Sequence, residues 1–425
     1  MNIITIAFQL FLSLALLIAA SIVTFRPRMF KRLMQIFPQS LGKRIVQAIA
    51  LWIALIATLG GIAVPFFVFF ASCITLISSI PLVLKAAHLK VSTTWVLPIV
   101  LVVSSVVVGI AQPLGLKVIA LPKADELPLN LCAARVIKTY DEGLWFEGIA
   151  ASEDGALYLS GNRNLDFSRN DYYHDAQGEL IERKLNGSER IIFKTPKGFT
   201  SGVPLFSRNK SIYLTSNGAT PCIWKIDSAE AAVKLVEFPK DAWPNGLDEG
   251  PDSMLYSPDS KLGVIWRIDP KTGTAEVVLR DTALLARPFI SLAPGANGLH
   301  FKGRDMLVTV SDRTTLLSYT MNQNGKFGKS VLIAKGIPGD DFAIGQDGSL
   351  FITTHPYNTV VKVTPSGERS IIAKMEQHIV GPTDAVFGKT PQDQNTLYVV
   401  TDGGAFTGGP KTKGELVALE PYMKK

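Results

Sequence analysis

The N-terminal quarter of this chain lacks acidic residues. Residues 1–116 contain neither Asp nor Glu, although the 425-residue chain has 36 of them. The same region carries eight basic residues, and removing these from the chain's 43 leaves 35 basic against 36 acidic residues. The remainder of the chain is therefore close to neutral. The net charge of +7 does not indicate a nucleic-acid-binding surface, and we predict no nucleic-acid partner.

Several motifs that carry chemistry in other proteins are missing as well. The sequence has no phosphate-binding loop, no CxxC pair, no HExxH helix and no GxSxG elbow. If the chain hydrolyses esters, a serine nucleophile of the elbow type is not available to it. Three cysteines are present, of which Cys73 lies in an apolar stretch. Cys132 and Cys222 either form a disulfide outside the cytoplasm or are isolated small apolar residues.

Long apolar stretches fill the region that lacks acids. Ile3–Phe25 and Thr94–Leu114 each approach the length that crosses about 30 Å of hydrocarbon, and Ile45–Leu84 is twice as long. Gly60 and Pro65 lie near the middle of that long stretch, where a tight hairpin can turn. Residues 1–116 are therefore predicted to be a transmembrane region of about four helices, with spans near 3–25, 45–63, 66–85 and 95–115.

The basic residues indicate how these spans are oriented. Six of them lie in the loop 26–44, which is expected on the cytoplasmic side of the bilayer. Four spans then place residue 117 onward in the periplasm or the extracellular space. A single long middle span, giving three crossings, would reverse that orientation. The lipid bilayer is thus a predicted partner, and protein partners are unknown.

Residues 132–425 follow a linker at 117–131 and read as an all-β domain. Short segments rich in β-branched and aromatic residues are bounded by Gly, Asp, Asn or Pro. Four phrases share one pattern, in which a polar residue precedes a strand residue by eleven positions, and two weaker phrases resemble them. The six phrases start at Glu147, Ser201, Asn245, Asn297, Asp340 and Thr383, which are 43 to 54 residues apart. This spacing predicts a six-bladed β-propeller.

A propeller also needs its two chain ends in one blade, so that no sheet edge is left open. Ala134–Tyr140 and Gly414–Glu420 are the expected partners. In each blade the innermost strand is expected to begin at the mouth of the central channel. The residues that start the phrases are then expected to face that mouth.

Four of the six starting residues offer oxygen atoms. Each one alone is compatible with ordinary turn chemistry. Together, two carboxylates and two amides converging on one point make a cage suited to a hard cation such as Ca²⁺ or another divalent ion. Asp341 either supplies a further oxygen or is a surface turn carboxylate. The predicted metal ligands are Glu147, Asn245, Asn297, Asp340 and Asp341.

Residues 132–420 resemble a known family of six-bladed propeller hydrolases that includes gluconolactonase, regucalcin and the paraoxonases. The matching segments are Glu147-Gly148, Pro244-Asn245-Gly246, Ala296-Asn297-Gly298, Gly339-Asp340-Asp341-Phe342 and the stretch Asp347–Lys362. The resemblance implies that Glu147, Asn245, Asn297 and Asp340 hold a catalytic Ca²⁺ or similar ion. In the paraoxonase-like branch the residue after the Asp also binds metal, which implies the same role for Asp341.

The general base is where this chain departs from its relatives. Paraoxonase-like enzymes have a His at the start of the second phrase, where this chain has Ser201-Gly202. His355, at the end of a strand in blade five, is the best remaining imidazole, followed by His174. Asp340 can alternatively serve as ligand and base, and Asp384 is either a turn residue or reaches the channel. The candidate catalytic residues are Asp340, Glu147 and His355.

These observations predict a membrane-anchored hydrolase of lactones or esters, of the lactonase or arylesterase type, that depends on Ca²⁺ or another divalent cation. Its partner would be a small-molecule lactone or ester. One alternative is a propeller without hydrolytic activity, as in strictosidine-synthase-like proteins. A second alternative is a sensor or binding module whose spans transmit a signal.

Overall fold

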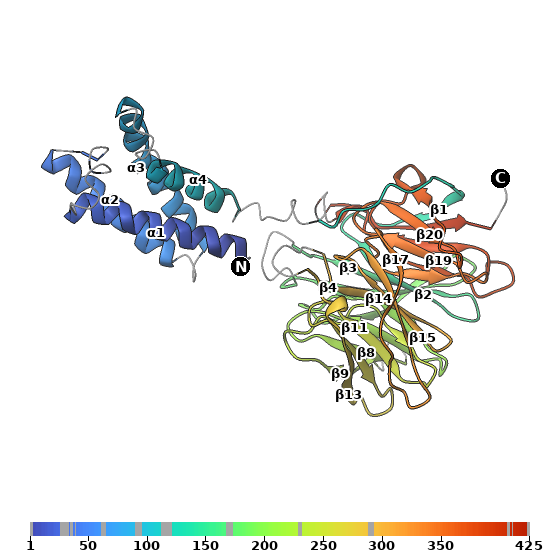
Figure 1. The fold of residues 1–425 in the computed structure, drawn as a ribbon. Coiled ribbons are helices and arrows are strands. Elements are labelled where there is room, and N and C mark those ends of the chain that lie inside the picture. The colour runs from blue at the N-terminus through green and yellow to red at the C-terminus, as the bar shows by residue number, and fades with distance from the viewer. Residues whose placement is uncertain are drawn as a thin grey trace. The chain divides into compact units, whose positions relative to one another are not determined.

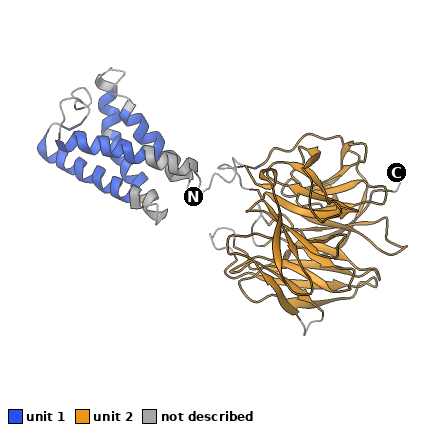
Figure 2. Cartoon of the chain, turned by 60° about the horizontal axis from the view of Figure 1, so that its bottom comes forward, with its two compact units in different colours: residues 1–121 blue, residues 122–425 orange. Residues whose placement is uncertain are grey.

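A computed structural model gives the structure of the chain. It describes residues 3–25, 34, 37, 38, 40–60, 65–89, 96–111, 121–166, 173–227, 232–287, 293–405, 409 and 411–422. The chain divides into two compact units, Met1–Leu121 and Pro122–Lys425, which Figure 2 colours separately. The first unit is helical and the second is all-β (Figure 1).

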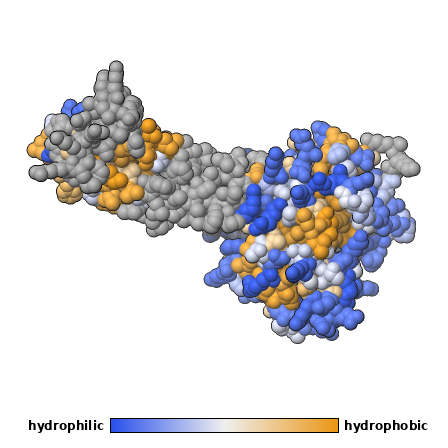
Figure 3. All heavy atoms as spheres, in the orientation of Figure 1, coloured by the Kyte–Doolittle hydropathy of each residue, from blue (hydrophilic) through white to orange (hydrophobic). Residues whose placement is uncertain are grey.

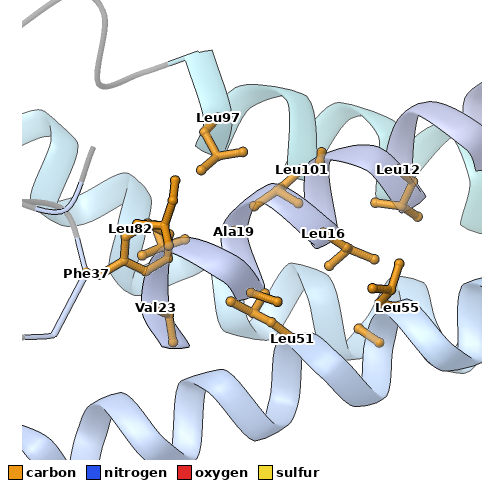
Figure 4. Packing of buried hydrophobic residues seen from close by; sticks show 14 of the residues in the cluster. Leu12, Leu16, Ala19, Val23, Phe37, Leu51, Leu55, Leu82, Leu97 and Leu101 are labelled. Carbon is orange, nitrogen blue, oxygen red and sulfur yellow. The ribbon is translucent and has the colours of Figure 1, made fainter. Parts of the chain in front are cut away.

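The helical unit contains four helices: α1 (Ile3–Phe25), α2 (Leu41–Gly60), α3 (Pro65–Leu89) and α4 (Val96–Ala111). Helices α1 and α3 each pack against both α2 and α4. Leucine and alanine side chains fill the space between them, among them Leu16, Leu51 and Leu101, as Figure 4 shows. The four predicted spans therefore correspond to four helices that share one apolar core.

Membrane crossing is a separate question from helix formation. Among the described residues, one helical segment, Leu41–Thr58 of α2, is long and apolar enough to cross a bilayer. The apolar segments described in the other helices are shorter: Leu12–Phe25, Ala71–Ala86 and Leu97–Val106. The transmembrane assignment of all four helices stays a prediction. The basic loop 26–44 lies mostly outside the described residues.

The second unit is a six-bladed β-propeller, as the repeat predicted. Each blade is a four-stranded sheet whose strands run antiparallel in sequence order, and the last blade also takes in β1. Blade one is β2 (Trp145–Ala151), β3 (Leu157–Arg163), β4 (Gln177–Arg183) and β5 (Glu189–Lys194); blade two is β6 (Pro204–Phe206), β7 (Ile212–Ser216), β8 (Cys222–Ile226) and β9 (Ala232–Glu237); blade three is β10 (Asp248–Glu249), β11 (Leu255–Asp259), β12 (Val264–Ile268) and β13 (Ala275–Arg280). Blade four is β14 (Ala296–Lys302), β15 (Asp305–Val310), β16 (Thr315–Thr320) and β17 (Val331–Lys335); blade five is β18 (Phe342–Ile344), β19 (Leu350–Thr354), β20 (Thr359–Val363) and β21 (Arg369–Lys374); blade six is β22 (Pro382–Phe387), β23 (Leu397–Thr401), β24 (Glu415–Glu420) and β1 (Ala133–Thr139).

The eleven-residue spacing corresponds to one hairpin register. In three blades the third residue after the polar start pairs with the strand residue at position eleven: Ala150 with Tyr158, Asp248 with Tyr256, and Ala343 with Phe351. In blade four the hairpin is one residue shorter, so Val308 pairs with Leu299 instead. The repeated phrase is thus the first hairpin of a blade.

The two ends of the propeller meet in blade six. Strand β1 pairs antiparallel with β24, from Ala133 opposite Glu420 to Thr139 opposite Glu415. This confirms the expected closure. Six apolar clusters fill the spaces between neighbouring blades, for example Leu307 with Ile352 between blades four and five. The ring is therefore held by contacts between blades all the way around.

The segment that precedes β1 lies along blade five. The amide of Asp125 donates to the carbonyl of Gly336 at 2.9 Å, and the amide of Asn130 donates to Ile371 in β21 at 2.8 Å. Cys132 packs against the cluster between blades five and six, whereas Cys222 is buried between blades one and two. Because they lie in different clusters, the two cysteines do not form the disulfide that the sequence left open.

Candidate metal centre

The residues that start the phrases are joined by backbone hydrogen bonds around the channel. Gly246 N donates to the carbonyl of Asn297 at 3.0 Å, and Gly298 N donates to that of Asp340 at 2.9 Å. In the next blade, Asp341 N donates to the carbonyl of Thr383 at 3.2 Å. In each case the residue after one start binds the start of the next blade. These bonds join four of the six starts, from Asn245 to Thr383, in one continuous row.

The glycines in the Asn-Gly pairs are required by this close approach. A Cβ atom on Gly246 would lie 2.7 Å from the carbonyl oxygen of Asn297. A Cβ on Gly298 would lie 2.7 Å from Cα of Asp341. Both distances are far below normal contact, so neighbouring inner strands can meet here only at glycine. The Asn-Gly motif therefore builds the site as well as lining it.

Three of the predicted ligands and one predicted base form a cluster. The Nδ2 atom of Asn297 donates to Oδ1 of Asp340 and, at 2.9 Å, to Oγ of Ser311. The Nδ1 atom of His355 is 4.0 Å from Oδ2 of Asp340. The Glu147 carboxyl is close enough to Asp340 and His355 for their charges to shift its pKa.

Burial and mutual repulsion perturb the two carboxyl groups. Burial, reinforced by the charge of Asp340, raises the pKa of Glu147 from 4.5 to about 8. Burial likewise raises the pKa of Asp340 from 3.8 to about 7, although His355 partly offsets this. Two carboxylates that are mostly shielded from water and act on each other's charge are costly to ionise together without a positive charge nearby. Such a site favours a cation.

Asn245 lies beside this cluster and is buried. Its Nδ2 donates to Oγ of Ser260 at 3.2 Å, and its neighbour Gly246 is bonded to Asn297. Asn217, which the sequence did not single out, donates through Nδ2 to the carbonyl of Pro244 at 3.0 Å. Its Oδ1 is buried without a hydrogen-bond partner among the described residues. A buried acceptor of this kind next to Asn245 suits a site that takes up a cation.

His355 is held by a carboxylate that the sequence reasoning missed. Its Nε2 is 3.0 Å from Oδ2 of Asp402, which is almost fully buried. Burial alone would lower the pKa of His355, but the charge and hydrogen bond of Asp402 outweigh it and raise the pKa to about 9. His355 follows β19 and Asp402 follows β23, so both end the second strand of a blade. This equivalent position in neighbouring blades was the feature of the sequence that could have indicated Asp402.

Asp341 joins a second group of titratable residues. Its Oδ1 is 3.1 Å from Nε2 of His300, whose Nδ1 is 3.6 Å from Asp248. Asp384 accepts a hydrogen bond from Ile149 N at 2.9 Å, and its ligand atom lies within 4.8 Å of those of His300 and Asp341. Asp384 thus reaches the channel. Burial and the charge of Asp341 hold its pKa well above the usual range.

Two residues weighed in the sequence lie elsewhere. Ser201 is fully buried, and its amide and carbonyl both bind the side chain of Asn162, at 2.8 and 2.7 Å. This position therefore joins blades one and two. His174 is exposed in a turn after β3. His355 is the histidine that the structure places next to Asp340.

The donor set fits a hard divalent cation. Carboxylate and amide oxygens from four blades are the ligands that Ca²⁺ prefers, and no sulfur or imidazole interrupts the set Glu147, Asn245, Asn297 and Asp340. The two perturbed carboxyl groups and the unpartnered Asn217 oxygen agree with that fit.

No protein-family model matches the chain, and no curated protein matches it. Among solved structures, it is similar to a calcium-binding protein, regucalcin, from Agrobacterium tumefaciens, with 15% identity, coverage of 69% of this chain and 97% of the other, and a TM-score of 0.47. A gluconolactonase from Xanthomonas campestris shows 16% identity, 71% and 97% coverage, and a TM-score of 0.47. A virginiamycin B lyase from Staphylococcus aureus shows 13% identity, coverage of 67% of this chain and 98% of the other, and a TM-score of 0.43. Likenesses this distant carry no argument about chemistry.

Proposed function

We propose that this protein is a hydrolase of lactones or esters that depends on Ca²⁺ or another divalent cation. The observation that carries the proposal is the convergence of Glu147, Asn297 and Asp340 beside His355. These groups come from equivalent positions around one channel, and two of them have strongly raised pKa values. Perturbed carboxyl groups beside an imidazole are typical of sites that move protons.

Glu147, Asn245, Asn297 and Asp340 would hold the ion, with Asp341 as a fifth ligand. When bound, the cation would polarise the carbonyl of the substrate and stabilise the oxyanion that develops when water attacks. The protein's own groups supply the rest. Asn297 orients Asp340 through its Nδ2 donor, and Ser311 and Ser260 fix the two amides. Preorganised ligands of this kind avoid reorganisation during the reaction.

The proton that leaves the attacking water needs an acceptor. Nδ1 of His355 lies 4.0 Å from Oδ2 of Asp340, so one water placed beside the two atoms can form a hydrogen bond to each of them. Asp340 itself is the alternative acceptor. The buried position of Ser201 explains why the base is not at the second phrase, since that residue is part of the contact between blades one and two.

We further propose that the helical unit anchors the protein in a membrane through four spans, with the propeller on the periplasmic or extracellular side. Apolar side chains are exposed along the helices, including Val46, Ile56 and Ile77, each at least 67% exposed. Figure 3 shows hydrophobic surface, in orange, on the helical unit. The hydroxyl groups of Thr58, Thr75 and Ser79 donate to carbonyls one turn earlier, at 2.7 Å each. Exposed apolar surface with internally bonded hydroxyls suits a lipid environment. Carbonate extraction that releases the full chain from membranes would contradict this.

The activity is tested on the purified full-length protein. We expect it to hydrolyse members of a lactone and phenyl-ester panel with Ca²⁺ and to lose turnover with a chelator. Asn297→Ala should lower kcat/KM by about 100-fold, because it removes one ligand and the donor to Asp340. Asn186→Ala, in an exposed turn, is the matched control and should keep full activity.

Three results would count against the proposal or a part of it. Hydrolysis that a chelator does not affect would exclude the metal-dependent mechanism. Ca²⁺ binding without turnover of any compound in the panel would favour a ligand-binding module. Unchanged activity in Asn297→Ala would remove that residue from the site.

A further inference from the structure

The Asp402 carboxylate contacts His355 and is itself held by the backbone turn that follows it. Oδ2 of Asp402 is 3.0 Å from Nε2 of His355, while its Oδ1 accepts a hydrogen bond from Gly404 N at 2.6 Å. The amide of Asp402 donates to the carbonyl of Gly381 at 2.8 Å. Both carboxylate oxygens and the backbone are therefore engaged, and the carboxylate has little freedom to turn away from the imidazole.

Three glycines make this arrangement possible. Gly403 and Gly404 have φ angles of 66° and 82°, which bring the chain back toward the Asp402 carboxylate. A Cβ on Gly381 would lie 1.6 Å from Oδ1 of Asp402, so any side chain there would displace the carboxylate. The backbone around Asp402 is thus shaped to place its carboxylate against His355.

The contact fixes which nitrogen of His355 carries a proton. A carboxylate only accepts hydrogen bonds, so Nε2 must be the protonated nitrogen. Because the pKa of His355 is raised to about 9, both nitrogens carry protons at neutral pH in the metal-free protein. Once the ring is neutral the lone pair is on Nδ1, the atom on the side of Asp340 at 4.0 Å. An imidazole with one nitrogen held by a carboxylate and the other directed at a reaction site has the geometry of an oriented general base.

We propose that Asp402 is the positioning residue that makes His355 the general base of the proposed hydrolysis. Nδ1 of His355 takes a proton from water while the water oxygen bonds to the carbonyl carbon. The bond from that carbon to the ester oxygen then breaks, and the proton passes from Nδ1 to the leaving oxygen. Ester and water become acid and alcohol, or a hydroxy acid from a lactone. The inference rests on the proposed function.

Kinetics of the full-length protein test the pairing. Asp402→Asn is expected to lower kcat about 10- to 100-fold with KM little changed, because it loosens the base without removing it. His355→Ala should cost roughly 100-fold or more. The double variant should be no slower than His355→Ala alone, since the two residues act as a unit. Additive losses, or a kcat for Asp402→Asn equal to the wild type, would overturn the proposal.

Asp393→Asn is the matched control. Asp393 is a buried carboxylate of the same blade that accepts hydrogen bonds from Thr390 N and the Tyr398 hydroxyl, at 2.9 and 3.3 Å. These contacts stay within the hairpin formed by β22 and β23. Asp393→Asn should therefore keep the kcat of the wild type. A loss in Asp393→Asn as large as that in Asp402→Asn would show a general effect of buried carboxylates and would count against positioning.

An NMR spectrum of the histidine side chains tests the His355–Asp402 pairing independently of the proposed hydrolysis. The chain has five histidines, so selective ¹⁵N-histidine labelling gives five imidazoles, and His355→Ala identifies one. We expect Nε2 of His355 to carry a downfield proton that moves upfield in Asp402→Asn. An unprotonated Nε2, or an unchanged signal in Asp402→Asn, would overturn the positioning. If the wild type hydrolyses nothing while this signal behaves as expected, the proposed function fails and the His355–Asp402 pairing stands.

Discussion

The raised pKa values of the Glu147 and Asp340 carboxyl groups are the property that favours a cation at this site. Their pKa values of about 8 and 7 mean that, at pH 7 in the metal-free protein, the Glu147 carboxyl is mostly protonated and the Asp340 carboxyl is about half protonated. A divalent cation binds the ionised groups, so its binding must displace those protons. The affinity for the cation is therefore coupled to pH through these two residues.

This coupling gives a prediction at the scale of single residues. We expect Ca²⁺ binding to the full-length protein at pH 7 to release roughly one to two protons per ion. The affinity should weaken as the pH falls from about 8 to 6. Calorimetry in two buffers with different ionisation enthalpies measures the proton count. Glu147→Gln should release fewer protons than the wild type. Binding that is independent of pH and releases no protons would argue against Glu147 and Asp340 as ligands.

The spacing of the repeat was enough to predict that Glu147, Asn297 and Asp340 lie together, because equivalent positions in a ring must converge. Asp402 was not predictable in the same way. It is 47 residues from His355, and each looks like an ordinary residue before a turn. Their meeting depends on how blades five and six approach each other. The pairing of Asp341 with His300 was missed for the same reason.

At the scale of elements, the polar starts do not occupy one fixed place in the inner strands. The sequence predicted that these strands begin at the channel mouth and that the starting residues face it. Strands β2 and β14 do include Glu147 and Asn297, but β10 and β18 begin only after Asn245 and Asp340. The amides next to these starts bond to neighbouring blades instead of to their own sheet. The sequence showed the eleven-residue spacing, whereas it did not show these hydrogen bonds between blades.

Gly298 lies where the inner strands of blades four and five meet, next to the candidate site. A Cβ there would lie 2.3 Å from Oδ1 of Asp341 as well as against its backbone. We expect Gly298→Ala to lower the free energy of unfolding by about 1–3 kcal/mol, because the inner strands of blades four and five must separate. It should also weaken Ca²⁺ binding. Thermal unfolding and calorimetry of the full-length variant measure both effects.

Gly328→Ala is the control for this substitution. The nearest atom to a Cβ at Gly328 is the Thr320 carbonyl oxygen at 3.7 Å, an ordinary contact. Its stability should lie within about 0.5 kcal/mol of the wild type. Equal stability of the two variants would show that the blades do not depend on glycine at position 298.

At the scale of the whole molecule, closure makes the propeller respond as a unit. Strand β1 from one end of the domain completes the sheet of β24 from the other, and apolar clusters join every pair of neighbouring blades. The groups at the channel are contributed by several blades. A change in their charge therefore acts on the stability of the ring rather than on one blade.

The pH dependence of stability follows from the raised pKa values. Glu147 rises from 4.5 to about 8, Asp340 from 3.8 to about 7, and His355 from 6.5 to about 9. A raised pKa means that the folded state binds the proton more tightly than the unfolded state. The stability from these groups is complete below their unfolded values and is lost as the pH rises through the folded values. The window of loss runs from about pH 5 to 9.

Carboxylates with lowered pKa values act in a different range. Hydrogen bonds from Ser349 outweigh burial and lower the pKa of Asp347 from 3.8 to about 2, so its contribution is lost only in acid, below about pH 4. Between pH 5 and 9 this group is ionised in both states and contributes no slope. The channel groups are thus expected to set the sign in that interval.

We therefore expect the metal-free full-length protein to melt at a lower temperature at pH 9 than at pH 6, by several degrees. Saturating Ca²⁺ should raise the melting temperature more at pH 9 than at pH 6, because the ion stabilises the ionised carboxylates that repel each other without it. Differential scanning calorimetry with chelator and with Ca²⁺ measures both slopes. In Glu147→Gln the metal-free slope should flatten, since one of the titrating channel groups is gone. A metal-free protein that gains stability from pH 6 to pH 9 would show that the channel carboxyl groups do not govern it.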